Sequence, residues 1–311
     1  MSLNQIFILK MIDAVCGRLA VSVMPPPKQS QPSDCQKILI IRPGGIGDAA
    51  LLVTAINALK RFYPQARVDI LAERRNAAVF KLTSQIDNVY LYDRGGISSV
   101  LSKTYDVVID TEQWHRLSAV IARLVRAPVK VGFATNERRR MFTHAVSYDH
   151  QAYEADSFCV LLAPLGITRE RDELDSPFLE VPDVDMQAAQ SLLNNLSGQR
   201  YVVIFPGASI VERRWPVSRY HQLANVLHAQ GFPVVIIGGP DDRDAGEAIV
   251  EGLEGLNLAG KTSLSGSAAV ISQSILLVSG DSGMLHIAVG LGVATVSLFG
   301  SGIVVKGGPK G

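Results

Sequence analysis

A glycine-rich segment near the start of the chain combines residues that suit anion binding with a carboxylate. It reads RPGGIGD from Arg42 to Asp48 and separates the apolar run KILII from a helix-like stretch. Gly44, Gly45 and Gly47 allow a tight turn and close backbone approach, and the amides at the helix start can hold an anion. The charge of Asp48 suits the first turn of a helix, but it opposes a pyrophosphate bound at the same amides.

The same glycines also fit a nicotinamide enzyme. Read from Gly45, the segment matches the pattern G-x-G-x-x-A, and Glu73 follows the next predicted strand, where such an enzyme places its ribose-binding acid. A short glycine match is weak by itself, and Asp48 opposes the pyrophosphate. An NAD-dependent oxidoreductase that uses Gly45, Gly47 and Glu73 is therefore the less favoured alternative.

A second loop, FPGASIVERRWP, follows a predicted strand in the other half of the chain. Ser209 offers a hydroxyl group, and Arg213 and Arg214 place two positive charges directly before Trp215 and Pro216. A plain surface loop with a packed tryptophan and a proline at a helix start would also explain the segment. Phosphate binding explains the paired arginines better.

A third loop, GGPDDRDAGEAI, ends a strand with glycines and starts a helix with Asp241 or Asp242. Helix capping explains one of these aspartates, and Asp241 is a candidate acceptor for the hydroxyl groups of a ribose.

The fourth loop, SGDSGMLHIAVGLG, predicts a helix capped by Asp281 and Ser282. Gly283 would let the first amides of that helix reach a phosphate, and His286 follows one helical turn later. An isolated histidine is more often structural, but beside D-S-G at a strand end we favour a role in ligand binding.

Strands and helices that alternate from Lys37 onward would position these four loops. The strands are nearly continuous apolar runs and the helices are amphipathic, which is typical of a parallel sheet covered on both faces. In the first half, we predict strands at 37–42, 67–72, 88–93, 105–110 and 129–134, and helices at 46–63, 76–82 and 114–126. In the second half, we predict strands at 200–207, 232–239, 256–260, 275–283 and 293–300, and helices at 186–196, 217–230, 241–251, 267–274 and 284–291. The pattern predicts two doubly wound α/β domains whose strand ends face a cleft.

The predicted domains are 37–180 and 181–311, because the stretch 168–185 is polar and contains prolines and acids. Residues 1–36 form an N-terminal extension and linker. Lys10, Asp13 and Arg18 interrupt its apolar residues, so it is too polar for a membrane-spanning helix and poor as a signal peptide. We expect an amphipathic helix, which either packs on the domain surface or anchors the protein at a membrane interface.

The overall charge does not favour a nucleic-acid partner. Thirty basic residues balance twenty-nine acidic ones, and the run Glu137–Arg140 is interpreted as a solvated loop rather than a binding patch. The cysteines Cys16, Cys35 and Cys159 are odd in number and widely spaced, which argues against a disulfide framework or a cysteine zinc site and fits a reducing cytoplasm.

Taken in order, the four loops resemble glycosyltransferase family 9, the ADP-heptose:lipopolysaccharide heptosyltransferases. The resemblance covers residues 37 to 300 and rests on ILIIRPGGIGDAALLVTAINALKRFYP, FPGAS with RRWP, GGPDD and SGDSGMLHIAVGLGVATVSLFG. It implies a GT-B fold, with an N-terminal acceptor domain and a C-terminal nucleotide-sugar domain facing a central cleft. It also implies inverting transfer of a heptose from ADP-heptose to a lipopolysaccharide core acceptor, without metal or cofactor.

The resemblance also assigns roles to individual residues. Asp48 matches the proposed general base, and Asp241 matches an acid expected at the nucleoside. The remaining matches concern the donor: they are Ser209 and Arg213 at the diphosphate, and Asp281, Ser282, Gly283 and His286 in the donor segment D-[ST]-G-x-x-H. A lipid-linked acceptor would suit peripheral contact of residues 1–36 with the cytoplasmic face of the inner membrane.

Two features depart from the simplest form of this interpretation. The triplets Asp183–Asp185 and Asp242–Asp244 have the D-x-D form of metal-dependent transferases, but neither lies at a predicted strand end, so we interpret both as chance. The family also has a longer tail after VSLFG, which predicts a truncated or diverged member whose donor pocket lacks one wall. A non-catalytic nucleotide-binding member is therefore the second alternative.

Overall fold

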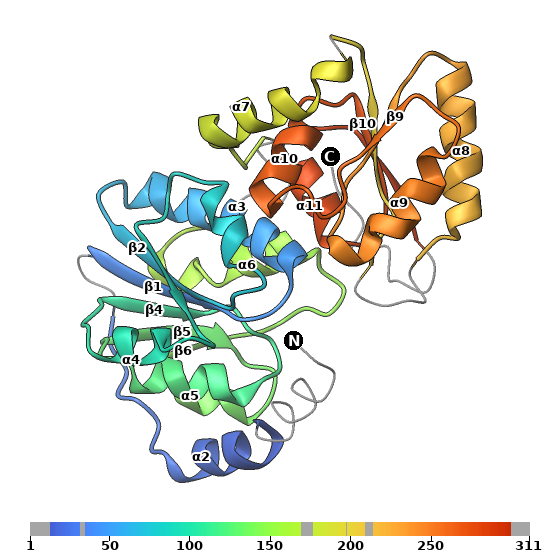
Figure 1. Ribbon diagram of the computed structural model, residues 1–311. Helices are drawn as coiled ribbons and strands as arrows, with labels where there is room; N and C mark the ends of the chain where they lie inside the picture. Colours follow the sequence, from blue (N-terminus) through green and yellow to red (C-terminus); the bar gives the residue numbers. More distant parts are fainter. Residues whose placement is uncertain (1–12, 32–34, 169–176, 197, 209–213, 300–311) are drawn as a thin grey trace. The chain divides into compact units, whose positions relative to one another are not determined.

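The computed structural model describes residues 13–31, 35–168, 177–196, 198–208 and 214–299 (Figure 1). The chain forms two compact units, each with its own parallel sheet. The first unit comprises Met1–Gly45, Thr54–Phe80 and Ser84–Glu173, and the second comprises Ile46–Val53, Lys81–Thr83 and Leu174–Gly311. The start of the helix that follows the glycine loop therefore belongs to the second unit.

Within the described residues, the sheet of the first unit has six parallel strands in the order β3-β2-β1-β4-β5-β6. The strands are β1 (Lys37–Arg42), β2 (Arg67–Ala72), β3 (Asn88–Leu91), β4 (Val107–Asp110), β5 (Val129–Phe133) and β6 (His144–Val146). In β1 and β2, all residues after the first are buried, because helices cover both faces. The strand order reverses between β1 and β4, and ligands of doubly wound sheets bind at the carboxyl ends of such strands.

The helical segments around this sheet are short apart from α3. They are η1 (Asp13–Gly17), α2 (Arg18–Val23), α3 (Ile46–Phe62), η2 (Ala77–Lys81), α4 (Gly96–Leu101), α5 (Arg116–Leu124), η3 (Glu137–Met141), α6 (Glu154–Val160) and η4 (Ala163–Leu165). The segment formed by η1 and α2 packs on α5, whose first turn it caps: Leu117 donates its amide to Oδ1 of Asp13 at 2.8 Å. Residues 13–23 of the N-terminal extension are thus helical and packed on the first unit.

The second unit has the same doubly wound α/β architecture as the first. Its sheet has the order β11-β10-β7-β8-β9, all parallel, and reverses between β7 and β10. The strands are β7 (Val202–Phe205), β8 (Val234–Ile236), β9 (Gly255–Asn257), β10 (Leu276–Gly280) and β11 (Thr295–Leu298). The helical segments are α7 (Asp183–Leu192), η5 (Asn194–Leu196), α8 (Val217–Ala229), η7 (Pro240–Asp242), α9 (Arg243–Val250), α10 (Leu264–Ser272) and α11 (Gly283–Gly290).

The predicted fold class of two doubly wound α/β units is confirmed. Several local predictions differ from the structure. The segment 76–82 is a short 3-10 helix, the helix expected from Trp114 begins only at Arg116, and the helix expected at 267–274 spans Leu264–Ser272. Helices α4 and α6 and strand β6 were not predicted. In the described part of the chain, no helix combines the length and apolarity needed to cross a bilayer.

Candidate active site

Two helix N-termini meet closely within the second unit, at the start of α3 and the start of α11. A Cβ atom added to Gly47 would lie 2.6 Å from Cδ2 of His286, and one added to Gly283 would lie 2.7 Å from Cβ of Ile46. Real side chains do not approach so closely, so each glycine makes room for the other helix. The start of α3 and the D-S-G-x-x-H segment, far apart in the sequence, are thereby brought together within the second unit.

His286 lies at this contact and is 7% exposed. Its Nδ1 has no hydrogen-bond partner among the residues that the structure describes. Burial lowers the pKa of His286 below its ordinary 6.5, whereas the nearby carboxylates of Asp48 and Asp281 oppose that shift. The native state therefore binds fewer protons than the unfolded chain just below pH 6.5, and this group's contribution to stability falls as the pH drops.

Ser282 does not cap α11 with its side chain, so that prediction was wrong. It occupies the N-cap position with an extended backbone, but its hydroxyl group makes no capping hydrogen bond. It pairs instead with the hydroxyl of Ser279 at 2.8 Å, beneath the end of β10. Asp281, Ser282 and Gly283 are each partly buried at the carboxyl edge of the sheet.

The two aspartates of the third loop have different environments. Asp242 is 8% exposed and accepts a hydrogen bond from the amide of Gly239 at 2.9 Å. Its carboxylate lies where a Cβ atom of Gly207 would be, 2.8 Å away, so it joins the loops after β7 and β8. Asp242 thus has the structural role, and Asp241 is left exposed at the start of η7.

The second loop is described only in part. Ser209 and Arg213 lie outside the described residues. Arg214 donates from Nε and Nη2 to the carbonyl of Ala208, at 3.3 and 3.2 Å. Trp215 packs edge-on against Tyr220, with ring centroids 5.0 Å apart, which is the packed tryptophan that the surface-loop interpretation expects.

The glycine loop needs its first glycine for conformational reasons. Gly44 has φ +118°, and a Cβ atom there would lie 2.7 Å from Nη2 of Arg42. The Arg42 side chain is buried and donates from Nη1 to the carbonyl of Thr111 at 3.0 Å. Gly45, the N-cap of α3, has an ordinary extended backbone with φ −74°.

A buried ionic cluster at the carboxyl ends of the first sheet was not predicted. Arg138 pairs with Asp110, and both side chains are fully buried. The interpretation of Glu137–Arg140 as a solvated loop was therefore wrong for Arg138, whose charge is neutralised inside the unit. Burial raises the pKa of Asp110, and the guanidinium of Arg138 opposes that rise.

Glu112 belongs to the same cluster. Burial would raise its pKa, but a hydrogen bond from His115 and the charge of Arg42 outweigh this and lower it to about 2. Acids at and just beyond the end of an apolar run, as in VVIDTE, are the signal that could have indicated the cluster.

Neither D-x-D triplet lies at a strand end: one begins α7 and the other spans η7 and α9. The described residues include no group of three or more histidine, cysteine or acidic side chains placed to hold a metal ion.

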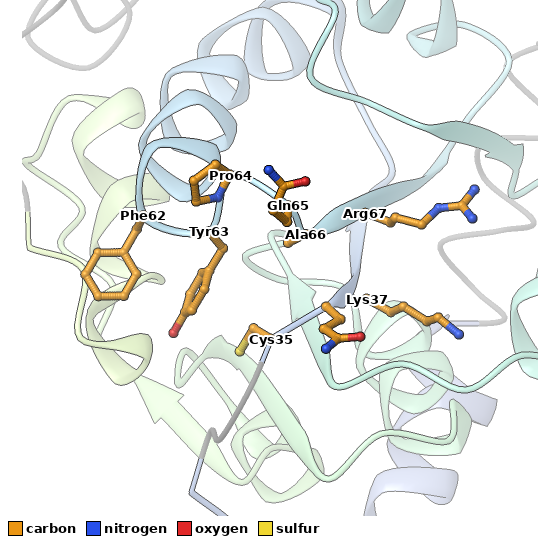
Figure 2. A pocket seen from close by; sticks show the side chains of 9 residues that line it. Cys35, Lys37, Phe62, Tyr63, Pro64, Gln65, Ala66 and Arg67 are labelled. Atoms are coloured by element: carbon orange, nitrogen blue, oxygen red, sulfur yellow. The ribbon is translucent and has the colours of Figure 1, made fainter.

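A cavity of about 530 Å³ lies at the amino ends of β1 and β2, the edge of the first sheet opposite the glycine loop (Figure 2). Phe62 and Tyr63 line it from the end of α3, and Cys35, Lys37 and Arg67 line it from the strand starts.

The contact between α3 and α11 predicts the effect of Gly47→Ala. The added methyl group would overlap the buried His286 ring, which cannot swing into solvent, so we expect a loss of about 1–3 kcal/mol of stability. Gly266→Ala is the matched control, since Gly266 also lies in the first turn of a helix and its added Cβ would be 3.4 Å from its nearest neighbours. Denaturant unfolding of both variants measures the difference; equal stabilities would show that the two helices do not pack closely.

The sequence of this chain is similar to those of known proteins. The family model described as Glycosyltransferase family 9 (heptosyltransferase) matches residues 97–309. Lipopolysaccharide heptosyltransferase 3 of Escherichia coli is 28% identical over 286 residues, which cover 82% of this chain and 81% of that protein.

Two solved structures have a similar fold. The glycosyl transferase family 9 structure from Veillonella parvula has a TM-score of 0.79 at 22% identity, covering 90% of this chain and 85% of that one. The structure of E. coli ADP-heptose lps heptosyltransferase II has a TM-score of 0.73 at 25% identity and covers 87% of both chains. The expected GT-B class, with two Rossmann-like domains, is thereby confirmed.

Proposed function

Since this chain belongs to glycosyltransferase family 9, the heptosyltransferase family, and is a glycosyltransferase, we propose that it transfers a heptose from ADP-heptose to a lipopolysaccharide core acceptor. The names of its relatives support both substrates: one is a lipopolysaccharide heptosyltransferase and another an ADP-heptose enzyme. The observation that carries the proposal is the contact of Gly47 with His286, because it brings Asp48 beside the D-S-G-x-x-H segment.

In the proposed reaction, Asp48 is the general base. Its carboxylate removes the proton from an acceptor hydroxyl as that oxygen attacks the anomeric carbon of the heptose. The bond from the anomeric carbon to the phosphate oxygen breaks, and its electron pair leaves on ADP. Attack from the face opposite ADP inverts the configuration. Asp48 is half-buried in the first turn of α3, which suits a carboxylate that meets a substrate.

The donor diphosphate would be held without a metal or cofactor. Arg213 and Ser209 supply a positive charge and a hydroxyl group, and the N-terminus of α11 at Ser282 and Gly283 supplies its dipole. These groups offset the charge that develops on departing ADP. Asp241, which is exposed where Asp242 is not, accepts hydrogen bonds from the nucleoside.

We also place the protein at the cytoplasmic face of the inner membrane, in peripheral contact with it. Val15, Leu19 and Val23 recur every four residues and are 59%, 65% and 76% exposed, so they form one apolar side of the N-terminal helical segment. Such a side suits an enzyme whose acceptor is a membrane lipid.

Isothermal titration tests the donor assignment. In buffer with excess EDTA, we expect ADP and ADP-heptose to bind, because the proposed diphosphate partners are an arginine and helix amides. Binding that needs added divalent metal would contradict the metal-independent mechanism, and binding of neither ligand would contradict the function. Enhanced NADH fluorescence on mixing would instead support the oxidoreductase alternative.

A further inference from the structure

Trp114 is a large aromatic side chain held in an exposed position on the first unit. Its side chain is 49% exposed, although β4 and the three residues between β4 and Trp114 are buried. The indole stacks on His150 with ring centroids 5.1 Å apart and an interplanar angle of 20°, and Tyr148 meets it edge-on at 6.3 Å. We call these three side chains the aromatic platform.

The backbone that carries Trp114 is fixed from inside the unit. Oε1 of Glu112 accepts hydrogen bonds from the successive amides of Gln113, Trp114 and His115, at 2.9, 2.9 and 3.4 Å. Since the pKa of Glu112 is lowered to about 2, this carboxylate stays charged and keeps all three bonds at neutral pH.

The backbone carbonyl groups of the same loop also accept hydrogen bonds. Buried Arg138 donates to the carbonyl of Glu112, Thr135 donates to that of Gln113, and Asn136 donates to that of Trp114 at 2.9 Å. Each of these donors comes from the segment after β5. The loop therefore cannot fold its tryptophan inward without breaking several hydrogen bonds.

The ring of Tyr148, which meets the indole edge-on, is fixed as well. Glu154, 4% exposed at the start of α6, accepts hydrogen bonds from the side-chain Nε2 of Gln113 and from the hydroxyl group of Tyr148, the latter at 2.9 Å. Tyr148 also packs edge-on against Phe133 at 4.9 Å. The Trp114 loop and Tyr148 are thus preorganised, so a ligand that binds there loses less of its affinity to ordering the protein.

The place of the platform in the fold points to a ligand. The Trp114 loop leaves β4, and the glycine loop leaves β1, the two neighbouring strands between which the order of the sheet reverses. Arg42, the last residue of β1, bonds to Thr111 at the start of the Trp114 loop. This edge is where doubly wound domains bind ligands.

We propose that the aromatic platform binds a pyranose ring of the acceptor. This inference rests on the proposed function, which supplies a carbohydrate acceptor. A pyranose presents a face of C–H groups that packs on the negative face of an aromatic ring. His150 stacks on one face of the indole, and the side chain is 49% exposed, so we assign the sugar to the face opposite His150. His115, 49% exposed beside Trp114, provides a polar edge for the sugar hydroxyl groups.

Fluorescence tests the contact directly. The chain has two tryptophans, so Trp215→Phe leaves Trp114 as the only indole. The probe is delipidated inner-core oligosaccharide, which makes the measurement independent of membrane contact. We expect saturable quenching of Trp114 emission, and no change at saturating oligosaccharide would overturn the proposal. This titration gives an answer even if the protein transfers no heptose.

Steady-state kinetics test acceptor binding by the platform separately from the proposed transferase activity. With wild-type activity established, Trp114→Ala is expected to raise the acceptor KM about 10- to 100-fold and to leave the ADP-heptose KM unchanged, whereas Trp114→Phe should retain most of the affinity. Phe62→Ala is the matched control, because Phe62 is 53% exposed but lies at the opposite edge of the sheet (Figure 2). Equal acceptor KM values for wild type and Trp114→Ala would overturn the inference while the proposed function stood.

Discussion

Asp48→Asn is expected to lower kcat for heptose transfer by about 10²- to 10⁴-fold, the usual contribution of a positioned general base. The amide has nearly the same shape as the carboxylate, so the packing of α3 on α11 should persist. It cannot accept a proton from the acceptor hydroxyl. Because Asp48 is proposed to act on the acceptor, the Kd for ADP should change by less than about twofold. Steady-state transfer assays and calorimetric titration measure the two quantities.

The control for this variant is Asp244→Asn. Asp244 is exposed in the first turn of α9, where it belongs to one of the D-x-D triplets. We expect its replacement to leave kcat unchanged. A loss of ADP affinity in Asp48→Asn, with transfer reduced only in proportion, would assign Asp48 to donor binding instead of proton removal.

Arg138→Met is expected to destabilise the protein by about 3–5 kcal/mol, because it leaves the Asp110 carboxylate buried without its cation. For a domain of this size, that corresponds to a fall in melting temperature of about 6–20 °C. The loss should grow as the pH rises above 3.8, since unpaired Asp110 binds a proton in the folded state more tightly than in the unfolded chain. Thermal unfolding followed at several pH values measures both effects.

Two further variants test whether the unpaired buried charge causes that loss of stability. Arg116→Met removes a surface ion pair with Glu137, at 2.8 Å, and should cost less than about 1 kcal/mol. The double variant Arg138→Met with Asp110→Leu should recover part of the lost stability, because no unpaired charge remains. If the Arg138→Met variant were as stable as the Arg116→Met variant, the buried pairing of Arg138 with Asp110 would be contradicted.

The sequence predicted the elements that bury the most apolar surface. KILIIR and RVDILA are continuous apolar runs, and they form β1 and β2 with the expected bounds. Their regular spacing with helices was enough to predict two doubly wound units. Strand β6 was missed because it has three residues, none of them fully buried, and hence no apolar run.

The candidate site was predicted in part. The approach of Gly47 to His286 could not be read from either segment, because it depends on how two helices from distant parts of the chain pack. Trp114 was placed in a helix, since apolar periodicity does not reveal that Glu112 binds the loop amides and delays the helix to Arg116. Arg138 was hidden within a run of charges whose other members are exposed.

Transfer itself is the most direct test of the central claim. The purified protein is incubated with ADP-heptose and with lipopolysaccharides truncated at successive core sugars, and the acceptors are analysed by mass spectrometry. The account predicts that an acceptor gains the mass of a heptose while an equal amount of ADP is released, with EDTA present. Binding of ADP-heptose without transfer to any truncated acceptor would contradict it and would identify a non-catalytic nucleotide-binding member of the family.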